Sequence, residues 1–192
     1  MSDYQQELAR LVLDEGYALR VARDVAALPA ELDERDARRL AAIAADPGLR
    51  LTRTLHRGWR LSKLLTLLPL TCAVADRTLL ETQVLSFWRL QPPRSLYFVD
   101  EAVRFVDHLI AALGETEMAL ADVARFEQAN LRLGDAARYR LPIGPVHVRL
   151  QHDPAQLLGR VVAGEPLDRV RRRPTELVGS VVDGATAWSS PG

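Results

Sequence analysis

The segment "RYRLPIGPVHVRLQHDP" at residues 138–154 decides the fold, because the pattern of the chain changes there. Its prolines and glycine are poorly suited to a helix. Three apolar residues then alternate with polar ones: Val146, Val148 and Leu150. Alternation with a period of two is typical of a strand that buries one face. We therefore expect a sheet to begin here, after a long helical region.

The rest of the C-terminal region fits a small β unit. Asp153 and Pro154 form an N-cap and first-turn pair, which predicts a short helix over "AQLLGRVV". Further on, "TELVGSVVDGATAWSS" at 175–190 holds Asp183-Gly184 between two apolar runs. That dipeptide is typical of the type I′ turn of a β-hairpin. Residues 134–192 are therefore expected to form a small mixed β domain.

Residues 1–133 have helical periodicity instead. Apolar residues recur every three to four positions, and prolines, glycines and Asp or Ser caps separate about six helices. The predicted helices cover residues 2–28, 34–45, 49–68, 77–90, 95–113 and 117–131. In the fifth, the expected buried face is Phe98, Ala102, Phe105 and Leu109. The fold class is therefore α+β, with an all-α domain at 1–133 and a β-rich domain at 134–192.

Composition is that of an ordinary globular protein. The 192 residues carry a formal net charge of zero, and 48% of them are hydrophobic. Cys72 is the only cysteine, which fits a reducing compartment. The N-terminus is polar, and the longest uncharged run, Leu64 to Ala75, is too short to span a bilayer. We expect a cytoplasmic protein that makes no membrane contact.

Familiar catalytic and metal-binding motifs are missing from the sequence. It has no Glu-x-x-His, H-E-x-x-H, Walker, dinucleotide-binding, nucleophile-elbow or C-x-x-C pattern. His147 and His152 flank the predicted strand, where we interpret them as polar edge residues rather than metal ligands. Glu101 and His108 are interpreted as part of a solvated ion-pair face, and Cys72 as a small buried residue. We therefore predict no catalytic residue, no metal ligand and no cofactor in this chain; a stand-alone enzyme using Glu101, His108 and Cys72 is the weaker alternative.

An arginine-rich stripe lies on the third predicted helix. No Asp or Glu occurs from Pro47 to Ala75, and four arginines at spacings of three and four share one face: Arg50, Arg53, Arg57 and Arg60. Like charges at these spacings destabilise a helix by about a few tenths of a kcal/mol per pair, so a counter-charge is expected. Acidic residues of neighbouring helices could supply it: Asp33, Glu34, Asp36 and Glu81. The functional alternative is an anionic partner, such as an acidic peptide, another subunit or nucleic acid.

The stretch "FWRLQPPRSLYFVDEAVRF" at 87–105 places aromatic residues around two prolines, which fix an extended turn. Together with "LPLT" at 68–71, it resembles the partner-subunit family of multinuclear non-heme iron-dependent peptide-modifying oxidases. The methanobactin-biosynthesis partner protein typifies that family. The resemblance covers residues 68–110. The matching residues are Phe87, Trp88, Pro92, Pro93, Ser95, Tyr97, Phe98, Glu101, Ala102 and Phe105.

The resemblance implies a non-catalytic subunit that binds a TIM-barrel iron oxidase and presents a ribosomally made precursor peptide to it. The iron would belong to the oxidase, which modifies cysteine in the peptide. Aromatic anchors are frequent hot spots of interfaces. The expected oxidase interface is therefore Trp88, Pro92, Pro93 and Tyr97, whereas Phe98 is assigned to the core.

The precursor peptide is expected to bind the C-terminal domain by strand addition. An unpaired sheet edge offers backbone donors and acceptors to an extended segment. The basic run "RVRRR" at 169–173 could add selectivity for acidic leader residues, or be a solvated turn. The predicted peptide-binding residues are Val146, His147, Val148, Arg149, Leu150, Arg171 and Arg172. The alternative function is a nucleic-acid-binding regulatory protein that uses the arginine stripe and the C-terminal hairpin.

Overall fold

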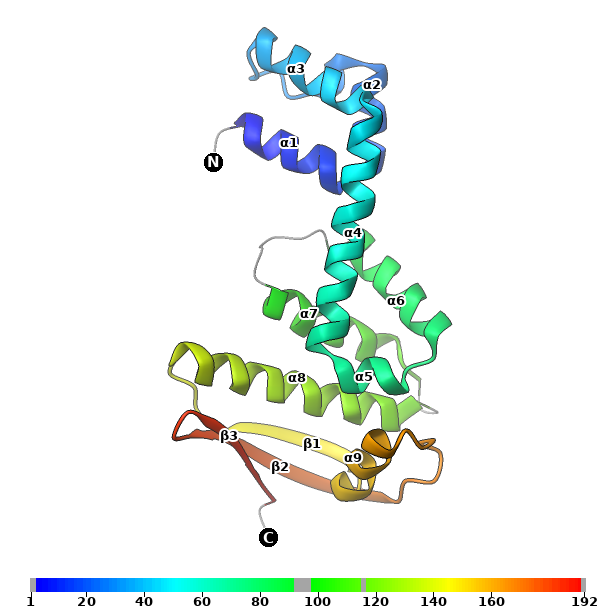
Figure 1. The fold of residues 1–192 in the computed structure, drawn as a ribbon, viewed down its shortest axis with the longest axis vertical. Helices are drawn as coiled ribbons and strands as arrows, with labels where there is room; N and C mark the ends of the chain where they lie inside the picture. Colours follow the sequence, from blue (N-terminus) through cyan, green and yellow to red (C-terminus); the bar gives the residue numbers. More distant parts are fainter. Residues whose placement is uncertain (1–2, 92–97, 115–116, 191–192) are drawn as a thin grey trace. The chain divides into compact units, whose positions relative to one another are not determined.

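The computed structural model describes residues 3–91, 98–114 and 117–190. The chain forms two compact units, Met1–Leu61 and Ser62–Gly192. The elements of both are labelled in Figure 1. The α+β class is confirmed, with helices in the N-terminal part and a small antiparallel sheet at the C-terminal end. None of the described helices combines the length and the apolarity that crossing a membrane requires.

The first unit is helical. It contains α1 (Asp3–Leu13), α2 (Glu15–Arg23), the short 3-10 helix η1 (Val25–Ala27), α3 (Glu34–Ala45) and most of α4 (Pro47–Leu67). The single helix predicted up to residue 28 is wrong, because the Asp14 carboxylate accepts the backbone N–H of Tyr17 and starts a new helix. The core of the unit is Leu11, Tyr17, Ala18, Val21, Leu28, Leu40 and Leu49.

Among its described residues, the second unit contains the end of α4, four further α-helices before the sheet, and one within it. These are α5 (Pro69–Val74), α6 (Arg77–Leu90), α7 (Phe98–Ala112), α8 (Met118–Tyr139) and α9 (Pro154–Ala163). Pro69 ends α4 as predicted and opens α5, which the sequence did not indicate. The predicted cap of α6 is confirmed, since Asp76 accepts the N–H groups of Thr78 and Leu79.

The helical core of the second unit is formed by α6 and α7 together with residues at the end of α4 and on α8. Ala102, Phe105 and Leu109 are fully buried, as predicted, and the rings of Phe87 and Phe105 meet edge to face at 5.6 Å. Phe98 is only partly buried. The predicted solvated face of α7 is wrong: Glu101 is 2% exposed and accepts a hydrogen bond from Trp88 Nε1 at 3.0 Å. His108 packs against the ring of Phe87 at 5.7 Å between ring centres.

The sheet contains β1 (Val146–His152), β2 (Arg172–Val182) and β3 (Ala185–Ser189) in the order β1-β2-β3, all antiparallel. The predicted hairpin turn joins β2 and β3, with positive φ at both Asp183 and Gly184. The predicted Asp153 cap of α9 is confirmed too, since its carboxylate accepts the N–H groups of Ala155 and Gln156. These hydrogen bonds lower the pKa of Asp153, with the Gln156 N–H contributing most.

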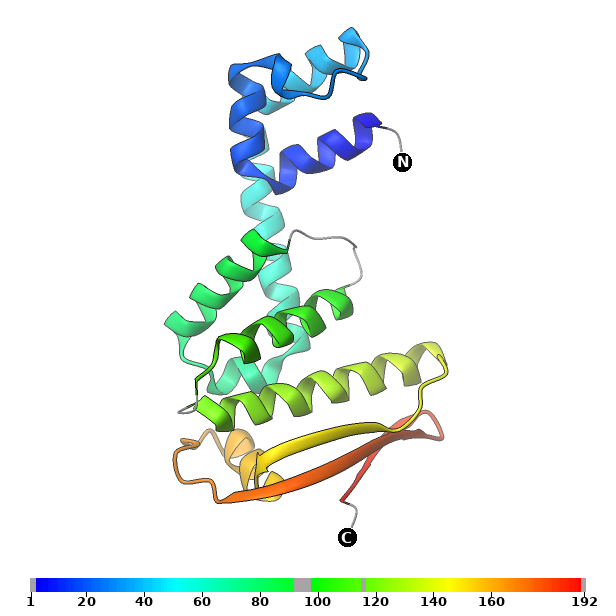
Figure 2. The ribbon, with the colours of Figure 1, turned by 180° about the vertical axis from the view of Figure 1, so that it is seen from behind.

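Helix α8 covers one face of the sheet, as Figures 1 and 2 show from opposite sides. Its side chains Phe126 and Ala129 pack on the apolar residues of the strands, which are Val146, Val148, Leu150, Leu177 and Trp188. The predicted domain boundary at 133/134 falls inside α8. The chain divides after Leu61 instead, because a small sheet with one apolar face is stable only when a helix covers that face.

Candidate functional site

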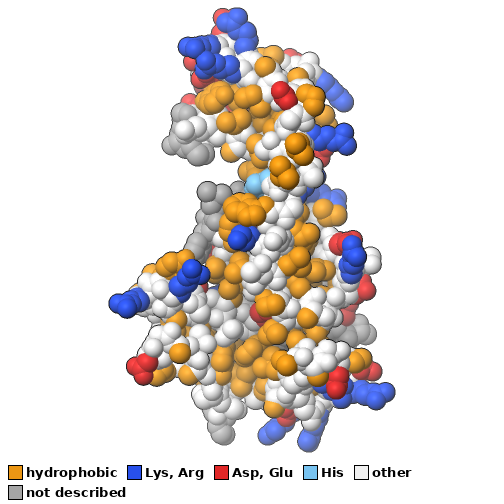
Figure 3. Space-filling model, in the orientation of Figure 1, with side chains coloured by type: hydrophobic (Ala, Val, Ile, Leu, Met, Phe, Trp, Pro, Cys, Tyr) orange, Lys and Arg blue, Asp and Glu red, His pale blue; other side chains and the backbone are white. Residues whose placement is uncertain are grey.

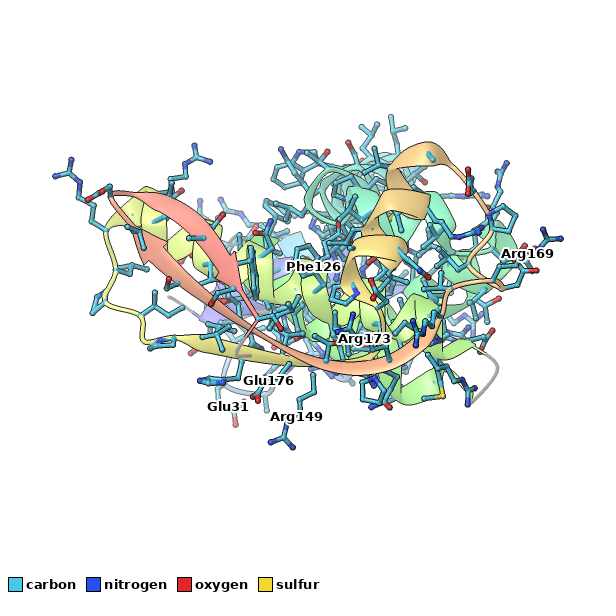
Figure 4. The ribbon with its side chains drawn as sticks, turned by 90° about the horizontal axis from the view of Figure 1, so that it is seen from below. Glu31, Phe126, Arg149, Arg169, Arg173 and Glu176 are labelled. Carbon is cyan, nitrogen blue, oxygen red and sulfur yellow. The ribbon has the colours of Figure 1, made fainter. Side chains whose placement is uncertain are left out.

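A groove of about 610 Å³ runs between α8 and the edge strand β1. Figure 4 shows Arg149 projecting from β1 away from the sheet, near Glu176. The groove is lined by Arg125, Gln128, Ala129 and Arg132 from α8, by Val146, His147, Val148 and Arg149 from β1, and by Glu176 from β2. Its volume lies within the range of ordinary ligand sites, and both walls are regular secondary structure.

Strand β1 has only one neighbouring strand in the part of the chain that the structure describes. Val148 and Leu150 point to the buried side and His147 and Arg149 to solvent, which is the predicted alternation. The far end of the strand is closed, because the Asp122 carboxylate accepts the N–H groups of Gln151 at 2.7 Å and of His152 at 3.0 Å. Residues 146–150 are therefore the stretch of this edge that an extended chain could pair with.

Asp122 also fixes the walls of the groove. Its side chain is buried, with one oxygen 2.9 Å from His152 Nδ1 and the other 3.0 Å from Arg125 NH1. One carboxylate on α8 thus holds the end of β1 and orients an arginine of the groove. Charged hydrogen bonds of this kind are the stronger ones in proteins, so the two walls keep a defined separation.

Cations dominate the groove. Arg125 is engaged by Asp122, and Glu176, the one carboxylate among the described lining residues, lies 3.1 Å from His147 Nδ1. No ion pair is found for Arg132 or Arg149 among the residues that the structure describes. Two exposed guanidinium groups on opposite walls favour carboxylate-bearing ligands, which they can hold with paired hydrogen bonds.

The structure places four predicted peptide-binding residues, Val146 to Arg149, in the groove. Leu150 is buried on the face toward α8, and it also lines a smaller hollow with Arg149. Arg171 and Arg172 do not line the groove. The carbonyl of Arg171 accepts a hydrogen bond from the N–H of Asp153, and Arg172 lies opposite His152 in the β1–β2 strand register, at the far end of β1. The basic run 169–173 begins in the loop between α9 and β2, where Figure 4 labels Arg169, and ends in the first residues of β2.

Sequence reasoning missed the α8 wall. Arg125, Ala129 and Arg132 recur at spacings of four and three, which is the signal of one helical face. That spacing did not indicate a site, because the predicted domain boundary separated most of α8 from the sheet. The sheet itself brings these side chains and β1 together.

The predicted arginine stripe is not a single exposed surface. Arg53 and Arg60 are buried, and Arg53 donates from Nε and NH2 to the carbonyl oxygen of Leu11 at 3.0 and 2.9 Å. Arg57 lies 3.3 Å from Glu15, with both side chains half exposed. The acidic partners that the sequence suggested have other partners: Glu34 pairs with Arg38, Asp36 with Arg39 and Glu81 with Arg77. Two of the four arginines, Arg53 and Arg57, thus contact other helices of the first unit.

The predicted oxidase interface can be followed only in part. Trp88 is half buried against the helical core of the second unit and is tied to Glu101. Pro92, Pro93 and Tyr97 lie outside the described residues.

Cys72 is mostly buried, and burial raises the pKa of its thiol to about 11, with the nearby Glu127 carboxylate adding to the effect. Within the described ranges, no three His, Cys, Asp or Glu side chains gather closely enough to hold a metal ion. Comparison of the chain with protein-family models, with curated proteins and with solved structures gave no significant match.

Proposed function

We propose that the chain is a peptide-binding subunit that takes an extended, acidic segment of a peptide into the groove between α8 and β1. The observation that carries this is the edge strand β1, whose residues 146–150 lie beside a groove with an exposed arginine on each wall, Arg132 and Arg149. Backbone pairing would give affinity with little demand on sequence, and Arg132 and Arg149 would select carboxylates.

The resemblance of residues 68–110 extends this proposal to a pathway role. The peptide would be a ribosomally made precursor, and the chain would present it to a separate iron-dependent oxidase that modifies cysteine. In that arrangement the chain is not catalytic alone, and its task is to bind and orient. The contribution of the groove is positioning, because a peptide held along a strand has a fixed register.

Hydrogen exchange tests the binding mode. The probe is a synthetic acidic peptide of about ten residues with alternating Val and Glu, which favours an extended chain. We expect the peptide to slow exchange of backbone amides within 146–150 while α6 and α7 are unaffected. Protection confined to helices, or no saturable binding, would contradict strand addition at this edge.

The alternative of nucleic-acid binding loses part of its support, since two of the four arginines of the proposed stripe are buried. Steeply salt-dependent binding to unrelated duplexes would favour it again.

A further inference from the structure

An apolar stripe is exposed on α4 in the first unit. Leu51, Leu55 and Trp59 follow one another at spacings of four residues and are 61%, 65% and 46% exposed. Hydrophobic side chains are seen along this helix in Figure 3. The opposite face carries the buried residues Arg53 and Arg60. Helix α4 is therefore amphipathic in an unusual sense, since its apolar side faces outward and two of its arginines face inward.

One border of the stripe carries two arginines, Arg50 and Arg57. Helix α4 contains no Asp or Glu. Arg50 is exposed and has no ion pair with any described residue, and Arg57, on the same border, is half exposed beside Glu15. Docking a second copy of α4 on the stripe would bring arginines together without any carboxylate from either helix, and the nearby Glu15 already pairs with Arg57. A partner with acidic residues beside its own apolar stripe is therefore the electrostatically complementary one.

Gly58 lies within the stripe, between Leu55 and Trp59. Glycine inside a helix costs about 0.5–1 kcal/mol relative to alanine. A Cβ added there would meet no described atom within 4 Å, so no contact seen in this chain requires a glycine. A missing side chain lets the backbone of a second helix approach closely, whereas a lipid surface gains nothing from it.

We propose that the Leu51–Leu55–Trp59 stripe docks an amphipathic helix of another protein, whose apolar face is bordered by Asp or Glu. The stripe spans about 12 Å along α4, or roughly two turns, so the partner helix would contribute two to three apolar anchors. This surface belongs to the first unit and the groove to the second. A substitution in the stripe therefore alters no residue of the groove, and the reverse also holds.

The test uses the full chain and two synthetic helical peptides of about six turns, with the same leucine stripe but with Glu or Lys at the bordering positions. We expect saturable binding of the Glu peptide by fluorescence anisotropy and none of the Lys peptide. The double variant Leu51→Ser/Leu55→Ser should lose roughly tenfold or more in affinity. Gly58→Ala should raise the melting temperature and still weaken binding, a pair of effects that a purely structural glycine would not give.

Three results would overturn the proposal. One is no binding of the Glu peptide, or binding that the serine double variant leaves unchanged. Another is binding to vesicles of phosphatidylcholine and phosphatidylglycerol that the serine variant abolishes, which would make the stripe a lipid-binding surface. The third is a concentration-dependent dimer that the serine variant dissociates, which would make the occupant a second copy of this chain.

Discussion

The carboxylate of Asp122 lies 2.9 Å from Nδ1 of His152, and both side chains are buried between α8 and the end of β1. The same carboxylate accepts two backbone N–H groups and a bond from Arg125. A single side chain thus accepts the backbone hydrogen bonds at the end of the edge strand and sets the distance between the two walls of the groove. Asp122 is the residue on which the candidate site depends most.

Asp122→Ala should destabilise the protein by about 3 kcal/mol, because it leaves buried donors of β1 without an acceptor. Urea denaturation followed by circular dichroism measures the loss. Asp168→Ala is the control, since Asp168 is exposed in the loop before β2 and should change stability by less than about 0.5 kcal/mol. Equal effects of the two substitutions would show that the Asp122 contacts add no net stability.

Gly179→Ala should destabilise the sheet. A Cβ at this position would lie 2.5 Å from Leu133 Cδ1 and 2.8 Å from the ring of Trp188, so these two packed side chains would have to shift. Overpacking of this kind costs about 1–3 kcal/mol. Gly159→Ala is the matched control: it lies inside α9 with no described atom within 4 Å, and it should stabilise the protein by up to about 1 kcal/mol. Thermal unfolding of both variants should show shifts of opposite sign.

Tyr17 should make stability depend on alkaline pH. Burial, with a hydrogen bond to Glu7 second, raises the pKa of its hydroxyl from 10.0 to about 12. A folded-state pKa above the unfolded value means that this contribution is complete below pH 10 and is lost as pH rises toward 12. We expect the protein to weaken over that range, and Tyr17→Phe to weaken less steeply. Absorbance at alkaline pH should show a tyrosine ionisation near pH 12 that Tyr17→Phe removes; a titration curve that Tyr17→Phe leaves unchanged would contradict the assignment.

The local elements were largely predictable because their signals lie within a few residues of one another. Asp153-Pro154 and Asp183-Gly184 act on the backbone beside them, and both acted as expected. The Val146–Leu150 alternation likewise depends only on one strand and one covered face.

The site could not be predicted in full because its two walls are about twenty residues apart in sequence and meet only through packing. Periodicity marks Arg125 and Arg132 as neighbours on α8, yet nothing in the sequence states that this face borders β1 rather than another helix. The burial of Glu101 was missed for a related reason: its partner, Trp88, lies on a different helix. The prediction that the arginines of α4 form one exposed stripe was wrong, because a guanidinium can be buried when it donates to a carbonyl such as that of Leu11.

Charge reversal in the groove gives the most direct test of the proposed function. Arg132→Glu and Arg149→Glu each place a carboxylate where the peptide's own carboxylates would bind, on opposite walls of the groove. Each should lower affinity for the alternating Val-Glu peptide by roughly tenfold, since a close like-charge contact replaces a salt bridge. The combined variant should bind the corresponding Val-Lys peptide instead. Isothermal titration calorimetry at two salt concentrations measures both effects.

Arg138→Glu is the matched control, because it reverses an exposed arginine on the same helix that does not line the groove. Arg171→Glu is the second, since the sequence pointed to this residue whereas the groove does not include it. Both should retain affinity within about twofold, given that distant exposed charges are screened at physiological salt. If Arg171→Glu weakens binding more than Arg149→Glu does, the peptide lies along the start of β2 and α9, and the α8–β1 groove is not its site.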